Sequence, residues 1–224
     1  MSTSRVQAIL RGAVRSLRGA PKFDDRQYWE ERYAAGGTSG DGSYGQLAEF
    51  KARVLNQFIV DRQIASAIEL GCGDGNQLSL IHYPRYVGLD VSASAIRRCI
   101  DRFRGDRCKS FFIYDPEAYD DSSGIFRADA ALSLDVIYHI VTDDLFELYM
   151  THLCAAARRF VVVYATNEDR REATHVRHRA FSRWIDDRGE FELVEQVPNP
   201  YPGTGTQQSD ASFFIFGRTS ERAR

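Results

Sequence analysis

Several features that mark particular protein classes are missing from this sequence. Its 224 residues include only four cysteines, with neither CxxC nor zinc-finger spacing: Cys72, Cys99, Cys108 and Cys154. We therefore expect reduced thiols and a cytoplasmic protein. No apolar run approaches the roughly 18 residues of a membrane-spanning helix, so we expect no stable membrane insertion. The formal net charge of -2 gives no general reason to expect a nucleic-acid partner.

Residues 1–23 differ from the rest of the chain in charge. Five cationic side chains and no acidic one precede Asp24; they are Arg5, Arg11, Arg15, Arg18 and Lys22. The interspersed apolar residues allow either an amphipathic helix that touches an anionic membrane or a partner, or a solvated, loosely docked helix. The segment lacks the continuous apolar core and the cleavage site of a secretory signal. We treat it as a basic N-terminal extension of one domain, residues 24–224.

Strand-like and helical segments alternate over most of the chain. Apolar side chains recur at helical spacing in residues 46–60, 93–103 and 143–156. Strand candidates lie at residues 65–70, 86–89, 110–114, 128–134 and 159–164. This alternation predicts a parallel sheet covered by helices on both faces.

The C-terminal part follows a different pattern. A helical segment, 179–187, precedes two strand-like segments, 191–197 and 212–216. The Pro- and Gly-rich connection 198–210 has no helical pattern, so these two strands should pair antiparallel. The predicted fold class is α/β: a doubly wound, mostly parallel sheet of seven strands with an antiparallel last strand.

A glycine-rich turn follows the first predicted strand, where residues 68–75 read IELGCGDG. Glycine is needed where a chain turns sharply and its backbone approaches a ligand closely. Asp90 ends the next predicted strand, 15 residues after Gly75. A carboxylate at that place can accept hydrogen bonds from both hydroxyls of a ribose. Together the turn and the spaced acid predict a site for a nucleoside cofactor.

The spacing of the glycines distinguishes between two kinds of cofactor. The dinucleotide fingerprint GxGxxG needs a glycine at position 76, where this chain has Asn76. The glycines stand instead at positions 71, 73 and 75, and Glu69 precedes them. In this pattern the chain resembles the class I S-adenosylmethionine-dependent methyltransferases, from about Tyr28 to its end. The resemblance implies a Rossmann-like fold, S-adenosyl-L-methionine as the cofactor, and a methyltransferase domain over residues 24–224.

The resemblance also implies roles for single residues. The methionine and ribose portions of the cofactor would be lined by Gly71, Gly73 and Gly75. Glu69 would help to hold the ammonium group, and Asp90 would take the ribose hydroxyls. Asp115 follows the third strand, where an acid often meets the adenine amino group in this family. An ordinary turn acid before Pro116 is the equal alternative for Asp115.

Two further segments resemble family motifs. Residues 132–139, LSLDVIYH, end the fourth predicted strand and look like the family's motif at that place, which puts Asp135 beside the cofactor. The same form recurs in a bacterial subgroup that modifies small molecules and glycans. Segments 28–33 (YWEERY) and 42–45 (GSYG) also suit that subgroup, in which they cap the cofactor.

The acceptor should bind outside the carboxyl ends of the strands. Polar candidates in the segments at that edge are Tyr138, His139, His175, His178 and Tyr201. His139 is the first choice as catalytic residue, a general base for a hydroxyl acceptor; the alternative is a structural histidine bonded to the backbone. His175 and His178 flank Arg177, and they either bind a carboxylate or phosphate or form a basic, solvated helix face.

Two chemistries are disfavoured. The (Asp/Asn/Ser)-Pro-Pro-aromatic motif of DNA amine methylation is missing, because residues 134–137 read LDVI. Asp135 with Asn167, Glu168 or Asp169 would imitate a metal-assisted site, but a plain loop offers the same acids, and we expect no metal.

The predicted function is methyl transfer from S-adenosyl-L-methionine to an oxygen, or less readily a nitrogen, of a small molecule or sugar. One alternative is a nicotinamide-dependent oxidoreductase, against which stand Asn76 and the lack of a Tyr-x-x-x-Lys pair. The other is a non-catalytic subunit that binds the cofactor and serves a partner.

Overall fold

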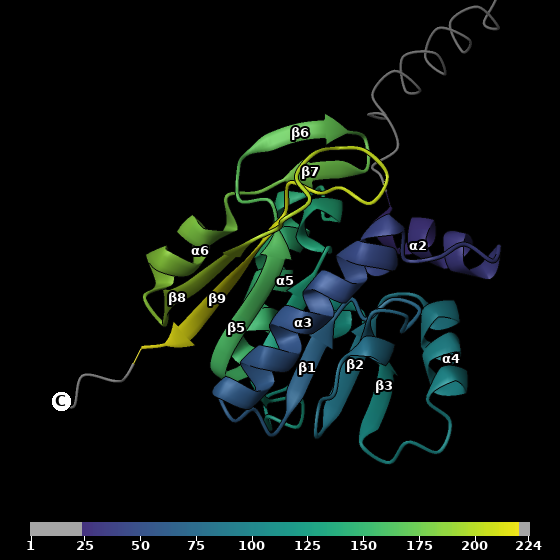
Figure 1. Ribbon diagram of the computed structural model, residues 1–224, viewed down its shortest axis with the longest axis horizontal. Helices are drawn as coiled ribbons and strands as arrows, with labels where there is room; N and C mark the ends of the chain where they lie inside the picture. The colour runs from purple at the N-terminus through teal and green to yellow at the C-terminus, as the bar shows by residue number, and fades with distance from the viewer. Residues whose placement is uncertain (1–23, 220–224) are drawn as a thin grey trace, which may run out of the picture.

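The computed structural model describes residues 24–219, so the predicted basic extension 1–23 lies outside the described residues (Figure 1). The helices are α2 (Asp25–Ala34), α3 (Gly45–Asp61), α4 (Ala93–Arg102), α5 (Asp143–Ala156) and α6 (Phe181–Arg188). Single 3-10 turns are η1 (Asp41–Ser43), η2 (Leu78–Leu80), η3 (Pro116–Ala118) and η4 (Ile137–His139). The strands are β1 (Ala67–Leu70), β2 (Tyr86–Asp90), β3 (Lys109–Ile113), β4 (Ala128–Leu134), β5 (Ala157–Ala165), β6 (Arg170–Ala173), β7 (Val176–His178), β8 (Phe191–Pro198) and β9 (Ser212–Arg218).

Seven of the strands form one sheet in the order β3-β2-β1-β4-β5-β9-β8. Neighbours among the first five strands are parallel, whereas β9 runs antiparallel to both β5 and β8. The predicted doubly wound, mostly parallel sheet with an antiparallel last strand is therefore confirmed. Because the strand order reverses between β1 and β4, the carboxyl ends of these two strands flank the crevice where such sheets bind ligands.

Helices cover both faces of the sheet, because its central strands bury side chains in both directions. On one face α3 and α4 pack over a cluster that includes Leu132 of β4 and Val162 of β5. On the other face α5 and α6 pack over Ala131 and Val163, which neighbour Leu132 and Val162 in the same strands. Figure 1 shows α3 in front of the sheet and α5 behind it. Within residues 24–219, no helix is both long and apolar enough to span a bilayer.

The main departure from the sequence prediction lies after β5. Residues 166–178 were predicted without a strand, but β6 and β7 form a separate antiparallel hairpin there. His178 on β7 bonds the Glu172 carboxylate on β6 (3.0 Å) and also the Thr166 hydroxyl. Such cross-strand contacts stabilise a hairpin rather than a helix. The interpretation of His175 and His178 as part of a basic helix face is therefore wrong.

Candidate active site

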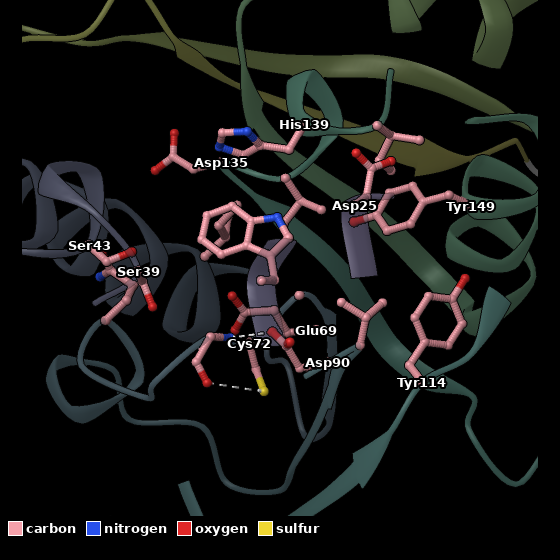
Figure 2. A pocket seen from close by; sticks show the side chains of 18 of the residues that line it. Asp25, Ser39, Ser43, Glu69, Cys72, Asp90, Tyr114, Asp135, His139 and Tyr149 are labelled. Carbon is pink, nitrogen blue, oxygen red and sulfur yellow. Dashed lines mark hydrogen bonds between the residues drawn. The ribbon is translucent and has the colours of Figure 1, made fainter. Parts of the chain in front are cut away.

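A pocket of about 880 Å³ lies at the carboxyl ends of β1, β2 and β4, and α2 contributes one of its walls (Figure 2). The glycine-rich turn lines the pocket on one side, and the segment after β4 lines it on another. The pocket therefore occupies the crevice that the strand order predicts.

The glycine-rich turn approaches its surroundings too closely for side chains. Gly71 has a φ of 93°, and a Cβ atom there would lie 2.4 Å from a methyl group of Val136. Gly71 and Gly73 line the pocket. Gly75 instead faces α4, where a Cβ would lie 2.9 Å from the Phe103 ring. The third glycine thus allows the turn to pack on the helix and does not border the pocket.

Asp90 lies at the end of β2, buried beneath the glycine-rich turn (Figure 2). One carboxylate oxygen accepts a hydrogen bond from the backbone N–H of Gly73 (2.8 Å), and the other accepts one from Ser92 (2.9 Å). Burial raises the pKa of Asp90 to about 6. A carboxylate offers roughly four acceptor positions, so about two remain for a ligand.

Glu69 lines the same pocket from β1. Its Oε2 atom accepts a hydrogen bond from the Tyr86 hydroxyl (2.6 Å), while Oε1 is left for another donor. Burial raises the pKa of Glu69 to about 7, although the positive charge of Lys51 acts in the opposite direction. A cationic group in the pocket would favour the ionised form of this carboxyl group.

A buried ion pair closes the pocket beside β4. The Lys51 ammonium of α3, whose side chain is 1% exposed, lies 2.5 Å from the Asp135 carboxylate. The Tyr138 hydroxyl donates to the other oxygen of Asp135 (3.0 Å). Asp135 itself has a φ of 59°, a left-handed conformation that few non-glycine residues adopt. Sequence reasoning missed Lys51, although this lysine falls on the apolar face of its helix, between Leu47 and Leu55.

The helix α2 covers the pocket with aromatic rings. Trp29 and Tyr33 both line the pocket, and their rings are stacked with centroids 5.7 Å apart. Glu30 of the same helix accepts hydrogen bonds from the Ser92 hydroxyl (2.7 Å) and from the hydroxyl and N–H of Ser94 (2.7 and 3.0 Å). These bonds fasten α2 to the start of α4. Tyr33 in turn bonds the Ser39 hydroxyl (2.9 Å), so the glycine-rich segment after α2 is held over the pocket as well.

Asp115 does not line the pocket. One of its oxygens accepts a hydrogen bond from the Glu117 N–H at the start of η3 (3.3 Å). The other lies 2.6 Å from the Arg26 guanidinium. A different carboxylate, that of Asp25 on α2, faces the pocket, and sequence reasoning missed it. Its position at the start of the aromatic helix α2 gives no local signal of a site.

His139 lines the pocket from η4. Its Nδ1 atom is 3.3 Å from the His175 carbonyl oxygen, and its ring packs edge-on against Trp29 at 5.0 Å. Burial lowers the pKa of His139 to about 4, so the ring is neutral at pH 7. Donation from Nδ1 to the carbonyl leaves Nε2 as the acceptor atom.

The other predicted acceptor-side residues divide into two groups. Tyr138 and His175 lie beside His139, with ring centroids 4.6 and 6.4 Å away. His178 holds the hairpin together, and Tyr201 does not border the pocket.

No cluster of three or more His, Cys, Asp or Glu residues suited to a metal occurs between positions 24 and 219. Asp135, the acid of the disfavoured metal site, has the Lys51 ammonium as its partner.

No protein-family model matches the chain, and no curated protein matches its sequence. Three solved structures of similar architecture are methyltransferases. The N-methyltransferase NodS from Bradyrhizobium japonicum WM9, in complex with S-adenosyl-L-homocysteine, is 17% identical with a TM-score of 0.70 over 88% of this chain and 100% of NodS. Magnesium protoporphyrin IX methyltransferase from Synechocystis PCC 6803 is 15% identical with a TM-score of 0.62, over 87% and 98% of the two chains.

A third similar structure is the methyltransferase domain of bacterial CtHen1. It is 21% identical with a TM-score of 0.59, and the match covers 76% of this chain and 97% of that domain. At these identities the comparison establishes architecture. This chain has the fold of the class I S-adenosylmethionine-dependent methyltransferases.

Proposed function

We propose that the protein is a methyltransferase that uses S-adenosyl-L-methionine and methylates an oxygen, or less readily a nitrogen, of a small molecule or sugar. The observation that carries the proposal is the acidic, ring-covered pocket at the glycine-rich turn. Asp90 lies beneath this turn, and Glu69 lies at the end of the strand that leads into it. The fold agrees with this function, and fold alone would not establish it.

The charge of the pocket suits a cationic ligand. Four carboxylates line it, those of Asp25, Glu69, Asp90 and Asp135, against one ammonium, that of Lys51. S-adenosyl-L-methionine carries a sulfonium and an ammonium group. The rings of Trp29 and Tyr33 on the covering helix add electron-rich faces that attract cations. A nicotinamide dinucleotide, with its two phosphates, would meet repulsion in the same pocket.

The hydrogen-bonding groups suit the rest of the molecule. The two remaining acceptor positions of Asp90 would receive the ribose hydroxyls. Gln77, buried in the pocket wall, donates its amide nitrogen to the Ala48 carbonyl (3.0 Å) and leaves its oxygen without a partner among residues 24–219. That oxygen and Oε1 of Glu69 would accept from the methionine ammonium group.

His139 is the proposed catalytic residue. When bound, the cofactor supplies an electrophilic methyl group, and the protein must hold the acceptor atom in line with it. The neutral His139 ring would accept the proton of a hydroxyl acceptor through Nε2. A pKa of about 4 makes it a weak base, so positioning by the pocket would provide most of the acceleration.

The rim around His139 favours a small acceptor. Trp29 and His139 line the pocket there, and the rings of Tyr138 and His175 pack against His139. Such a rim suits a flat or sugar-like molecule that stacks on aromatic side chains.

The proposal is tested by incubating the protein with methyl-labelled S-adenosyl-L-methionine and a panel of hydroxyl- and amine-bearing small molecules and sugars. Label should appear in at least one acceptor, and S-adenosyl-L-homocysteine should form in equal amount. Tight cofactor binding with no transfer across the panel would favour a non-catalytic binding subunit. Preferential binding of NAD would favour an oxidoreductase and overturn the proposal.

A further inference from the structure

The pocket has an apolar end that lies away from Asp135. Its walls are Val91, Tyr114, Pro116, Ile140, Leu145 and Tyr149. All but the proline pack in or against one core cluster of the domain. Figure 2 shows Tyr114, Tyr149 and Asp25 together on one side of the pocket, with Asp135 on the other. An apolar slot beside Asp90, the proposed ribose-binding residue, suits a flat heterocycle such as adenine.

Both tyrosine hydroxyls of this slot form hydrogen bonds to other groups of the protein. The Tyr114 hydroxyl bonds Nδ1 of His152 (2.8 Å). The Tyr149 hydroxyl bonds the Leu70 carbonyl (2.8 Å) and the Ser133 hydroxyl (2.7 Å). A carboxylate in the slot would bind the amino group of a heterocycle more strongly than either hydroxyl, because hydrogen bonds to charged groups are stronger.

Asp115, the residue that the family pattern suggests for that partner, is engaged outside the pocket. Arg26 and the Glu117 N–H each bond one of its oxygens, and a third of its side chain is exposed. These contacts hold it at the start of η3, outside the pocket lining. Turning it into the pocket would require breaking both contacts.

Asp25 has the opposite surroundings. The backbone N–H of Val141 acts to lower the pKa of its carboxyl group, but Oδ1 is buried and has no hydrogen-bond partner within the described part of the chain. A buried acceptor without a donor lowers stability, and native proteins tolerate few of them. Burial raises the pKa of Asp25 to about 6, so the carboxyl group is ionised at pH 7.5. Its unpartnered oxygen is a ready acceptor for an N–H group of a ligand.

We propose that Asp25, and not Asp115, recognises the adenine ring, with Oδ1 accepting a hydrogen bond from the 6-amino group. The inference rests on the proposed function, because it assumes an adenosyl cofactor. It assigns recognition of the base to the covering helix. The Arg26 side chain, next in sequence, ties down the competing acid while Asp25 enters the pocket.

The test compares two ligands by calorimetry at pH 7.5: S-adenosyl-L-homocysteine and S-inosyl-L-homocysteine, which carries a 6-oxo group in place of the 6-amino group. The wild-type protein should bind the adenosyl ligand about 10- to 100-fold more tightly, the range for one hydrogen bond to a charged group. Equal affinities would overturn the inference while leaving the proposed function intact. Failure to bind either ligand would instead count against the proposed function.

The Asp25→Asn variant provides the sharper result. Its amide oxygen should face the Val141 N–H. The amide nitrogen, a hydrogen-bond donor, would then point toward the ligand. Binding of S-adenosyl-L-homocysteine should weaken about 10- to 100-fold, and binding of the 6-oxo ligand should strengthen. Loss of structure alone would weaken both ligands together, so only a reversed preference supports the assignment. Unchanged preference in a folded variant would refute it.

Asp115→Asn is the matched control, because it changes the same functional group on the neighbouring turn. Its ratio of adenosyl to inosyl affinity should equal that of the wild type. A ratio that falls in Asp115→Asn and not in Asp25→Asn would assign the adenine to the acid after β3 and overturn the inference. Thermal denaturation of both variants checks that each is folded, and the wild-type comparison stands if either is not.

Discussion

Replacing Asp90 by asparagine should weaken ligand binding and reduce the dependence of stability on pH. The two carboxylate oxygens each hold one backbone N–H and would each meet one ribose hydroxyl. An amide offers only one acceptor oxygen, so at least one charged hydrogen bond to the ribose is lost. The Kd for S-adenosyl-L-homocysteine should rise about 10- to 150-fold, which corresponds to 1.5–3 kcal/mol.

The stability of the ligand-free protein should depend less steeply on pH in the variant than in the wild type. Asp90 has a pKa of about 6 when folded against an ordinary value of 3.8, so its ionised form is disfavoured by folding. Its favourable contribution is therefore full below pH 3.8 and is lost as pH rises through about 6. The difference corresponds to about 3 kcal/mol. Asparagine does not titrate and removes this dependence.

The assay is denaturant unfolding at pH 4.5 and pH 7.5, together with calorimetry at pH 7.5. Asp129→Asn is the control, because Asp129 also bonds two backbone N–H groups, those of Ala65 and Ser66, but lies at the opposite end of the strands. The control should bind the ligand with wild-type affinity. If Asp90→Asn also bound normally, the carboxylate would not face the ribose and the reasoning would be refuted.

Three other substitutions test the rest of the site. His139→Ala should lower kcat about 10²-fold while ligand affinity is kept, and the loss of rate below about pH 4 in the wild type should disappear; a full rate would make His139 structural. Glu30→Ala should loosen α2 and raise the Kd for S-adenosyl-L-homocysteine about 2- to 10-fold by calorimetry, whereas Glu31→Ala, which loses only a contact within α2, should not. Lys51→Met should reduce the free energy of unfolding by about 3–5 kcal/mol, because it leaves the buried Asp135 charge without its partner. Lys109→Met leaves the Asp106 carboxylate, which is 34% exposed, to water and should change the free energy of unfolding by less than about 1 kcal/mol; equal effects would contradict this account.

The sequence was most informative where the site is local. The first strand, the glycine-rich turn and Asp90 lie within 24 residues, so spacing alone placed them at one edge of the sheet. The strand at 128–134 and the helix at 143–156 were also predicted with the observed bounds. Periodicity is a strong signal in such long, buried elements.

The missed residues come from distant parts of the chain. Lys51 reaches Asp135 across 84 positions, and Asp25 enters the pocket from a helix that precedes the sheet. Neither contact has a local pattern, because each depends on how a helix packs over the strand ends. The hairpin β6–β7 was missed for another reason: its strands of four and three residues are too short and too charged to show a clear period.

The central claim is that the pocket binds an adenosyl-sulfur cofactor. Its most direct test is a calorimetric titration of the ligand-free protein with S-adenosyl-L-homocysteine and, separately, with NAD at pH 7.5. We expect one molecule of S-adenosyl-L-homocysteine to bind per chain, and no heat from NAD. Binding of NAD in place of S-adenosyl-L-homocysteine, or of neither, would contradict the account.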